Sequence, residues 1–346
     1  MQAMQSAKSM PGTPAALGFR MPGPGHPHRR TWMAWPHRQD LYGDGLAQTQ
    51  RSYAEVAHAI SRFEPVAMVV HPAHLDSAKR HLAPNIEIVP IAIDDAWIRD
   101  SGPTFLVHAD GRVGGVSWRF NAWGGKHAPC DADDALADQL LAHTESELAQ
   151  SFLTCEGGSL TTDGDGTLIC TETSILNPNR NPGVSKAWAE LELKRMLGIE
   201  KVVWLPGDPF DKETDGHIDG MCCSLGPGKV LFEVNRDPAD PHARILADNL
   251  AALTAQTDAR GRPFEVVTIE EASEAAATSD VFCKSYINFY KANGGIVLPV
   301  YGLPSDDRAA ESIRRAFPNF PIERVDVSAI APGGGSIHCI TQEEPR

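Results

Sequence analysis

Thiol, imidazole and carboxylate side chains recur in this chain beside glycine. One such stretch, 333–339, has three glycines followed by Ser-Ile-His-Cys. Glycine lacks a Cβ, so backbone or a ligand can approach it closely and positive φ is accessible. The run after the glycines is typical of a strand, on which neighbouring side chains face opposite ways. His338 therefore cannot be the base for Cys339, and a reactive thiol here needs a base from elsewhere. The alternative to a reactive thiol is that Cys339 serves only as a small buried apolar residue.

Four more loops carry acidic or basic groups beside glycine: 97–103, 156–159, 214–220 and 288–295. In 214–220 the flanking glycines argue against helix, and an extended segment would put His217 and Asp219 on one face. Such a pair forms either half of a metal site or an acid–base group. Metal needs further ligands at matching spacing, whereas the other histidines are scattered. We therefore predict catalysis without a metal.

These groups together indicate nucleophilic catalysis by Cys339 with His217 as its base, paired in space rather than in sequence. Three carboxylates near a thiol (Asp100, Glu156, Asp219) would raise its pKa unless a cation were bound. A planar guanidinium offers five donors that carboxylates accept in pairs. Its binding would neutralise the acids, lower the pKa of the thiol and hold the guanidinium carbon facing sulfur.

Helices and strands alternate in a pattern that would position these loops. Apolar residues spaced by three and four predict helices at 50–63, 75–82, 188–197, 242–253 and 308–317. Each precedes a β-prone run: 66–70, 86–93, 201–205, 264–269 and 322–327. Hairpin-like strands are predicted at 104–107, 113–120, 167–170, 230–234 and 296–300. Repeats that cannot bury their own apolar faces favour a closed, quasi-cyclic α/β arrangement. An open doubly wound sheet is the alternative, but GxGxxG and Walker motifs are lacking.

Bulk properties narrow the class of protein. The 346 residues carry a net charge of −14 and no basic stripe, which disfavours nucleic acid and suits a small cationic substrate. Seven cysteines without regular spacing argue against a disulfide framework. Neither a signal peptide nor a membrane-length apolar run is evident, so we expect a cytoplasmic protein. Residues 1–30, rich in Pro, Gly, Met and His, are expected to form a flexible arm or surface wrap, and 31–346 a single domain.

Seven motifs resemble those of agmatine deiminase, a guanidino-group-modifying enzyme related to bacterial peptidylarginine deiminases. They are WIRDSGPTF (97–105), FNAWGG (120–125), EGGS (156–159), LNPNRNP (176–182), ETDGHID (213–219), YINFYKANGG (286–295) and the cysteine loop. The resemblance spans roughly residues 31–342. It implies a five-fold pseudosymmetric α/β propeller (pentein) of ββαβ-type repeats around a central active-site channel. Although five helix–strand pairs are predicted, only four clear repeat units can be counted from the sequence.

The resemblance also implies a role for each site residue. Cys339 would form a covalent amidino intermediate, and His217 would act as general acid and base. Asp100 and Asp219 would bind the guanidinium nitrogens, and Glu156 would hold the catalytic group from the other side. Trp97 would pack on the substrate, and Glu213 is the candidate for binding a distal ammonium. The expected products are N-carbamoylputrescine, which leads to putrescine, and ammonia. No metal or organic cofactor is expected, and a homo-oligomer is compatible with the resemblance.

Three stretches depart from the family pattern. Leu160-Thr161-Thr162 replaces Ile-His-Val, Gly23-Pro24-Gly25-His26 replaces Pro-Ala-Glu-Trp, and the loop after Gly124-Gly125 is shorter and lacks Tyr and Trp. These stretches border the mouth in the family, so they concern the substrate tail. The alternatives are therefore the same chemistry on a peptidyl arginine or on a short guanidino acid or amine, an amidinotransferase, and a guanidino-binding protein without activity.

Overall fold

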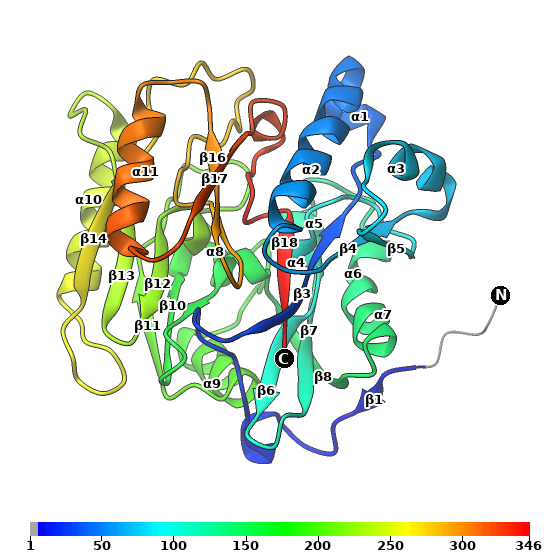
Figure 1. Cartoon of the computed structure of the whole chain (residues 1–346). Coiled ribbons are helices and arrows are strands. Elements are labelled where there is room, and N and C mark those ends of the chain that lie inside the picture. Colours follow the sequence, from blue (N-terminus) through cyan, green and yellow to red (C-terminus); the bar gives the residue numbers. More distant parts are fainter. Residues whose placement is uncertain (1–5) are drawn as a thin grey trace.

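The computed structural model describes residues 6–346, which form five β-sheets with flanking helices, a mixed α/β architecture (Figure 1). The strands are β1 (Lys8–Ser9), β2 (Phe19–Arg20), β3 (His28–Ala34), β4 (Val66–Val70), β5 (Glu87–Pro90), β6 (Thr104–His108), β7 (Val113–Arg119), β8 (Glu147–Thr154), β9 (Thr161–Thr162), β10 (Thr167–Thr171), β11 (Lys201–Leu205), β12 (Cys222–Gly226), β13 (Lys229–Val234), β14 (Glu265–Glu270), β15 (Tyr290–Lys291), β16 (Ile296–Val300), β17 (Ile322–Asp326) and β18 (Thr341–Pro345). The α-helices are α1 (Gln39–Tyr42), α2 (Leu46–Ile60), α3 (Leu75–His81), α4 (Ile98–Ser101), α5 (Ala122–Gly125), α6 (Asp131–Asp134), α7 (Leu136–His143), α8 (Glu172–Ile175), α9 (Lys186–Leu197), α10 (Pro241–Thr254) and α11 (Ser305–Ala316).

Each sheet repeats one unit. In the third sheet β13 pairs antiparallel with β12 and parallel with β14, and α10 connects the parallel pair. The same order holds for β6-β7-α7-β8, β9-β10-α9-β11, β15-β16-α11-β17 and β18-β3-α2-β4. A parallel pair needs such a crossover, because a tight turn can join only antiparallel strands. The connecting helices lie toward the outside of the molecule in Figure 1.

Local sequence explains the boundaries of these helices. The Asp240 side chain accepts a hydrogen bond from His242 N at the start of α10, and Pro241 occupies its first turn, where a missing N–H costs nothing. Gly198 ends α9 with φ 64°, a left-handed conformation that suits glycine. The predicted α9, α10 and α11 are confirmed to within three residues at each end.

One repeat was missed by the periodicity. The unit containing α7 and β8 is the fifth, whereas four were clear from the sequence. The seven-residue α3 was predicted at 75–82 and is confirmed, whereas helix α7, with eight residues, was not predicted. Its Leu136, Leu140 and Leu141 are nevertheless fully buried and join the core.

The two ends of the domain meet in one sheet. Strand β18 pairs antiparallel with β3, with Thr341 opposite Met33 and Gln342 opposite Trp32. In Figure 1 β18 lies near the middle of the molecule beside β3. Because Cys339 precedes β18 by two residues, this pairing fixes the thiol in the interior.

The described part of the N-terminal segment is not a free arm, which corrects the expectation of flexibility. Strand β1 pairs with β8 and β2 with β6, and Phe19 is only 1% exposed. Burial of an aromatic ring and the added strand pairing hold this segment on the domain as a wrap. Residues 1–5 of the predicted arm lie outside the described residues. Among the helices of residues 6–346, none is long and apolar enough to cross a membrane.

Candidate active site

Cys339 lies in a turn rather than on the predicted strand. Residues 337–340 form the turn, closed by Thr341 N donating to the His338 carbonyl (3.1 Å), and β18 begins only at Thr341. The predicted opposition of the two neighbouring side chains is therefore wrong. His338 Nδ1 lies 2.7 Å from Asp219 Oδ2, and Cys339 Sγ lies 3.7 Å from the same oxygen.

The glycines before this turn give it room. A Cβ on Gly335 would lie 2.5 Å from the Trp97 ring and 3.1 Å from Cys339 Sγ, too close for any real side chain. Trp97 is buried and packs on this glycine turn, beside the sulfur. The expected place of Trp97 at the site is consistent with this packing.

Asn288 fixes the cysteine turn from the other side. Its Oδ1 accepts from the backbone N–H groups of His338 (3.0 Å) and Cys339 (3.3 Å), and Sγ lies 3.4 Å from the same atom. Asn288 belongs to loop 288–295, and these contacts make it a positioning residue for the thiol.

The thiol is in an environment that opposes its ionisation. Cys339 is 9% exposed, and burial followed by the charges of Asp219 and Asp100 raises the pKa of the thiol well above its ordinary value. In the free protein the sulfur is consequently protonated near neutral pH. A bound cation would reverse the electrostatic part of this effect.

His217 is buried between two carboxylates. Its Nε2 lies 3.4 Å from Glu156 Oε2 and its Nδ1 3.8 Å from Asp100 Oδ1. Burial would lower the pKa of His217, but Asp100 and Glu156 outweigh it and raise the pKa to about 9. The imidazole is thus cationic at neutral pH, ready to donate a proton. Segment 214–220 is not extended as predicted: Asp219 lies in a 3-10 turn (Ile218–Gly220), which still directs its carboxylate into the site.

Asp100 is held on both oxygens. Gly158 N donates to its Oδ1 (2.8 Å) and Trp123 Nε1 to its Oδ2 (2.9 Å). Gly158 is where three functional groups converge: a Cβ there would lie 2.6 Å from His217 Nδ1, 2.8 Å from Asp100 Oδ1 and 3.1 Å from Asp219 Oδ2. Only glycine leaves this space free.

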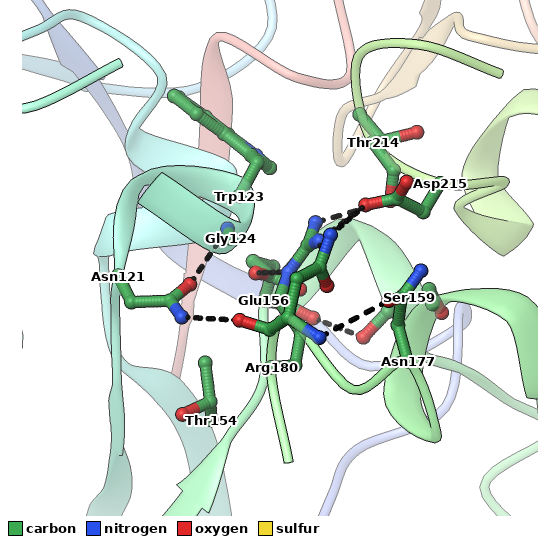
Figure 2. Close-up of polar contacts among 12 residues, drawn as sticks. Asn121, Trp123, Gly124, Thr154, Glu156, Ser159, Asn177, Arg180, Thr214 and Asp215 are labelled. Carbon is green, nitrogen blue, oxygen red and sulfur yellow. Dashed lines mark hydrogen bonds and ion pairs between the residues drawn. The ribbon is translucent and has the colours of Figure 1, made fainter. Parts of the chain in front are cut away.

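Arg180 was overlooked, although it stands in one of the motifs. Its Nε donates to Glu156 Oε1 (2.8 Å), and its other nitrogens bond Asp215 and the Thr214 carbonyl, so it joins two loops of the site (Figure 2). Burial would raise the pKa of Glu156, but His217 and Arg180 outweigh it and lower the pKa. Glu156, 1% exposed, is therefore a carboxylate already paired with a cation. A lone arginine in a loop carries no sequence signal for a partner more than twenty residues away.

A cavity of about 380 Å³ reaches this group. Cys339, His217 and Asp219 line it together with Asn288, so the structure brings the predicted thiol and imidazole to one space. Glu213 packs on Gly334 of the cysteine loop, and its carboxylate is paired with His127. Within residues 6–346, no group of three or more His, Cys, Asp or Glu side chains is arranged to hold a metal ion.

A thiol, an imidazolium and converging carboxylates lie close together here, an arrangement that can support nucleophilic attack on a bound cation. The chain matches the model of the Porphyromonas-type peptidyl-arginine deiminase family over residues 20–345, and it belongs to that family. It is 40% identical to the agmatine deiminase of Pseudomonas aeruginosa (strain LESB58) over 357 residues, covering 96% of this chain and 97% of the relative. The agmatine deiminase of Pseudomonas fluorescens is 39% identical, with the same coverage. The solved agmatine deiminase of Enterococcus faecalis superposes with a TM-score of 0.95 at 35% identity, covering 98% of this chain and all of that one.

Proposed function

We propose that this protein hydrolyses the guanidinium group of agmatine to N-carbamoylputrescine and ammonia. The observation that carries the proposal is the convergence on Gly158 of His217, Asp100 and Asp219, with the Cys339 sulfur beside Asp219. Carboxylates that converge in this way suit a planar cation with several N–H donors. Relatives that share about 40% identity over almost the whole chain are named agmatine deiminase, which supports agmatine as the molecule that carries this cation.

In the proposed reaction the substrate itself activates the thiol. Asp219 and Asp100 accept hydrogen bonds from the guanidinium N–H groups, and the charge of the guanidinium favours release of the Cys339 proton to solvent. The resulting thiolate attacks the central carbon to form a tetrahedral adduct. His217, cationic in the free protein, donates its proton to the departing nitrogen, and ammonia leaves an amidino-cysteine.

The second half of the reaction returns the enzyme to its starting state. The now neutral His217 takes a proton from water as the water attacks the amidino carbon. The C–S bond then breaks to give the ureido product, and the hydroxyl proton of the adduct passes to the departing sulfur, which restores the Cys339 thiol. Arg180 would keep Glu156 ionised throughout, so that Glu156 can hold the imidazolium from its far side. No step in this sequence calls for an organic cofactor.

The repeated strand unit supports a closed arrangement for the whole chain. We propose that the five units form a five-fold pseudosymmetric propeller, with the functional loops gathered around a central channel. The β18–β3 pairing would close that ring by joining the last strand to the first repeat. Residues 31–346 would then be one domain, with the preceding segment laid on its surface.

A substrate panel tests the proposed function. Agmatine, arginine, arginyl peptides and short guanidino acids are assayed for ammonia and for the ureido product. We expect agmatine to give the highest kcat/KM, and an inert agmatine would refute the proposal. Product masses with and without an added primary amine distinguish hydrolysis from amidino transfer, since an amidinotransferase would give an amidinated amine.

A further inference from the structure

Glu213, the carboxylate expected to bind the substrate's ammonium, is already paired with His127 in the free protein. His127 Nε2 lies 2.6 Å from Glu213 Oε1, and the two side chains are only 25% and 13% exposed. The contact is an ion pair rather than a well-directed hydrogen bond, since no aligned acceptor satisfies that nitrogen. An ammonium approaching Glu213 therefore meets a competing cation.

The loop that presents His127 is held in place. The Asn121 side chain accepts from Gly124 N (2.8 Å) and donates to the Asn179 carbonyl (2.8 Å), contacts that Figure 2 shows. Lys126 Nζ donates to the Glu213 carbonyl (2.8 Å) and pairs with Asp215 (2.8 Å). These contacts of Asn121 and Lys126 fix the loop, and with it the position of the His127 imidazole.

The same loop is strained where it turns. Trp123 has φ 52° and Gly124 φ 88°, and a non-glycine residue in the left-handed region persists only where its surroundings impose it. Trp123 also bonds Asp100 and meets the His127 ring edge-on at 5.6 Å. The conformation that holds a guanidinium-binding carboxylate is therefore the one that delivers His127.

The Glu213 side of the ion pair packs against the glycine loop that precedes Cys339. A Cβ on Gly334 would lie 2.6 Å from Glu213 Cγ, and one on Gly333 would lie 3.3 Å from Tyr42 OH. Two further buried polar atoms on this side of the site, Tyr42 OH and Asp95 Oδ2, have no hydrogen-bond partner, although Asp95 Oδ2 lies 3.6 Å from Arg38 Nη1. Buried polar atoms are normally satisfied by protein, water or ligand, so this end of the site can accept a polar tail.

We propose that His127 determines which substrate tails are accepted: its imidazolium holds Glu213 in the free protein, and the ammonium of a cationic tail must replace it. This inference rests on the proposed function and deepens it. Tails without a charge at this position meet no such competition. The protein would then discriminate among guanidino amines less sharply than a site with a free Glu213, and the preference would depend on the protonation of His127.

The direction of the pH effect follows from the charges that face His127. Glu213 and Asp95 raise the pKa of His127, whereas burial and Arg38 lower it, and the net pKa is raised. Lys126, the neighbouring cation, is neutralised by Asp215. As pH rises through the pKa of His127 the imidazole loses its charge, Glu213 is released, and KM for a cationic tail falls.

The test compares agmatine with n-butylguanidine, which has the same chain length and no ammonium. Their kcat/KM ratio cancels effects on the thiol and on the guanidinium chemistry. For the wild type we expect the ratio to rise between pH 6 and 9. In His127→Gln the ratio should be about tenfold higher than in the wild type at pH 6.5 and nearly independent of pH. The variant lacks the imidazolium that competes with the substrate ammonium for Glu213, and a tenfold change corresponds to about 1.4 kcal/mol.

Two variants complete the design. Glu213→Gln should lower the ratio by raising KM for agmatine alone. His108→Gln is the matched control, since His108 forms a histidine–carboxylate pair of the same 2.6 Å length with Asp110 away from the site. A ratio unchanged or lowered in His127→Gln would overturn the inference. Failure of the wild type to turn over either compound would instead refute the proposed function, and butylguanidine turnover shows that each variant is folded.

Discussion

Replacing Asp219 with asparagine should speed the alkylation of Cys339 but slow the deimination reaction. The carboxylate oxygen lies 3.7 Å from Sγ, and two unit charges at that distance interact by about 4 kcal/mol at an effective dielectric constant near 20. Loss of this repulsion would lower the pKa of the thiol by about three pH units, a gain of up to about 10³ in thiolate population. A less basic thiolate is also less nucleophilic, so alkylation should accelerate by about thirtyfold. Deimination should instead slow by at least about a hundredfold, because the guanidinium loses a charged acceptor.

The assay measures both quantities on the same samples. Iodoacetamide labelling of Cys339 at pH 7.5 is followed by peptide mass spectrometry, with Cys339→Ser identifying the site, and deimination is followed through the ureido product. Asp280→Asn is the matched control, since Asp280 lines the same cavity but is exposed and paired with Lys212. It should change neither rate. If Asp219→Asn labels more slowly than the wild type, the carboxylate activates the thiol and the electrostatic reasoning is wrong.

Three further predictions follow from the same contacts. Cys339→Ser should lower kcat by more than about 10³-fold while calorimetry still detects agmatine binding, and activity within tenfold of the wild type would exclude Cys339 as nucleophile. Arg180→Gln removes the hydrogen-bonded cation of buried Glu156, which keeps only the His217 imidazolium, and should lower the free energy of unfolding in urea by about 3 kcal/mol; an unchanged midpoint would contradict the role of the pair. Because the pKa of His217 is about 9 in the folded chain against 6.5 when unfolded, its contribution of about 3 kcal/mol is complete below pH 6.5 and disappears as pH rises through 9. His217→Gln should lack that loss, as urea titrations at pH 6 and 9.5 would reveal.

The parts of the fold that could be predicted are those with a repeated local signal. Helices of twelve residues or more show their apolar stripe, as α10 does with Leu246 and Leu253 buried. Shorter helices were predicted unevenly: the seven-residue α3 was found at 75–82, whereas the eight-residue α7 was missed. Glycine beside an acid or base marked the functional loops because the close approaches at Gly158 and Gly335 exclude any side chain.

The contacts that depend on long-range pairing could not be predicted. The β-prone residues after the glycines indicated a strand, but pairing with β3 begins only at Thr341, and the preceding residues form a turn whose backbone bonds Asn288. That turn brings both His338 and Cys339 to Asp219, whereas period-two alternation would place the two side chains on opposite faces. Sequence pattern reports local geometry, whereas this site is fixed by partners from four separate loops.

The charges of the site explain why its thiol can stay protonated until a substrate arrives. Arg180 cancels Glu156, and the imidazolium of His217 cancels one of the two remaining acids, Asp100 and Asp219. One negative charge is left beside the sulfur, which suppresses the thiolate in the free protein and is neutralised by a single guanidinium. The bound cation thus supplies both the electrophilic carbon and the charge that frees the nucleophile. A neutral urea or amide of the same shape would not supply that charge, so we expect the charge balance of the cavity to confine C–N bond cleavage by Cys339 to cationic substrates.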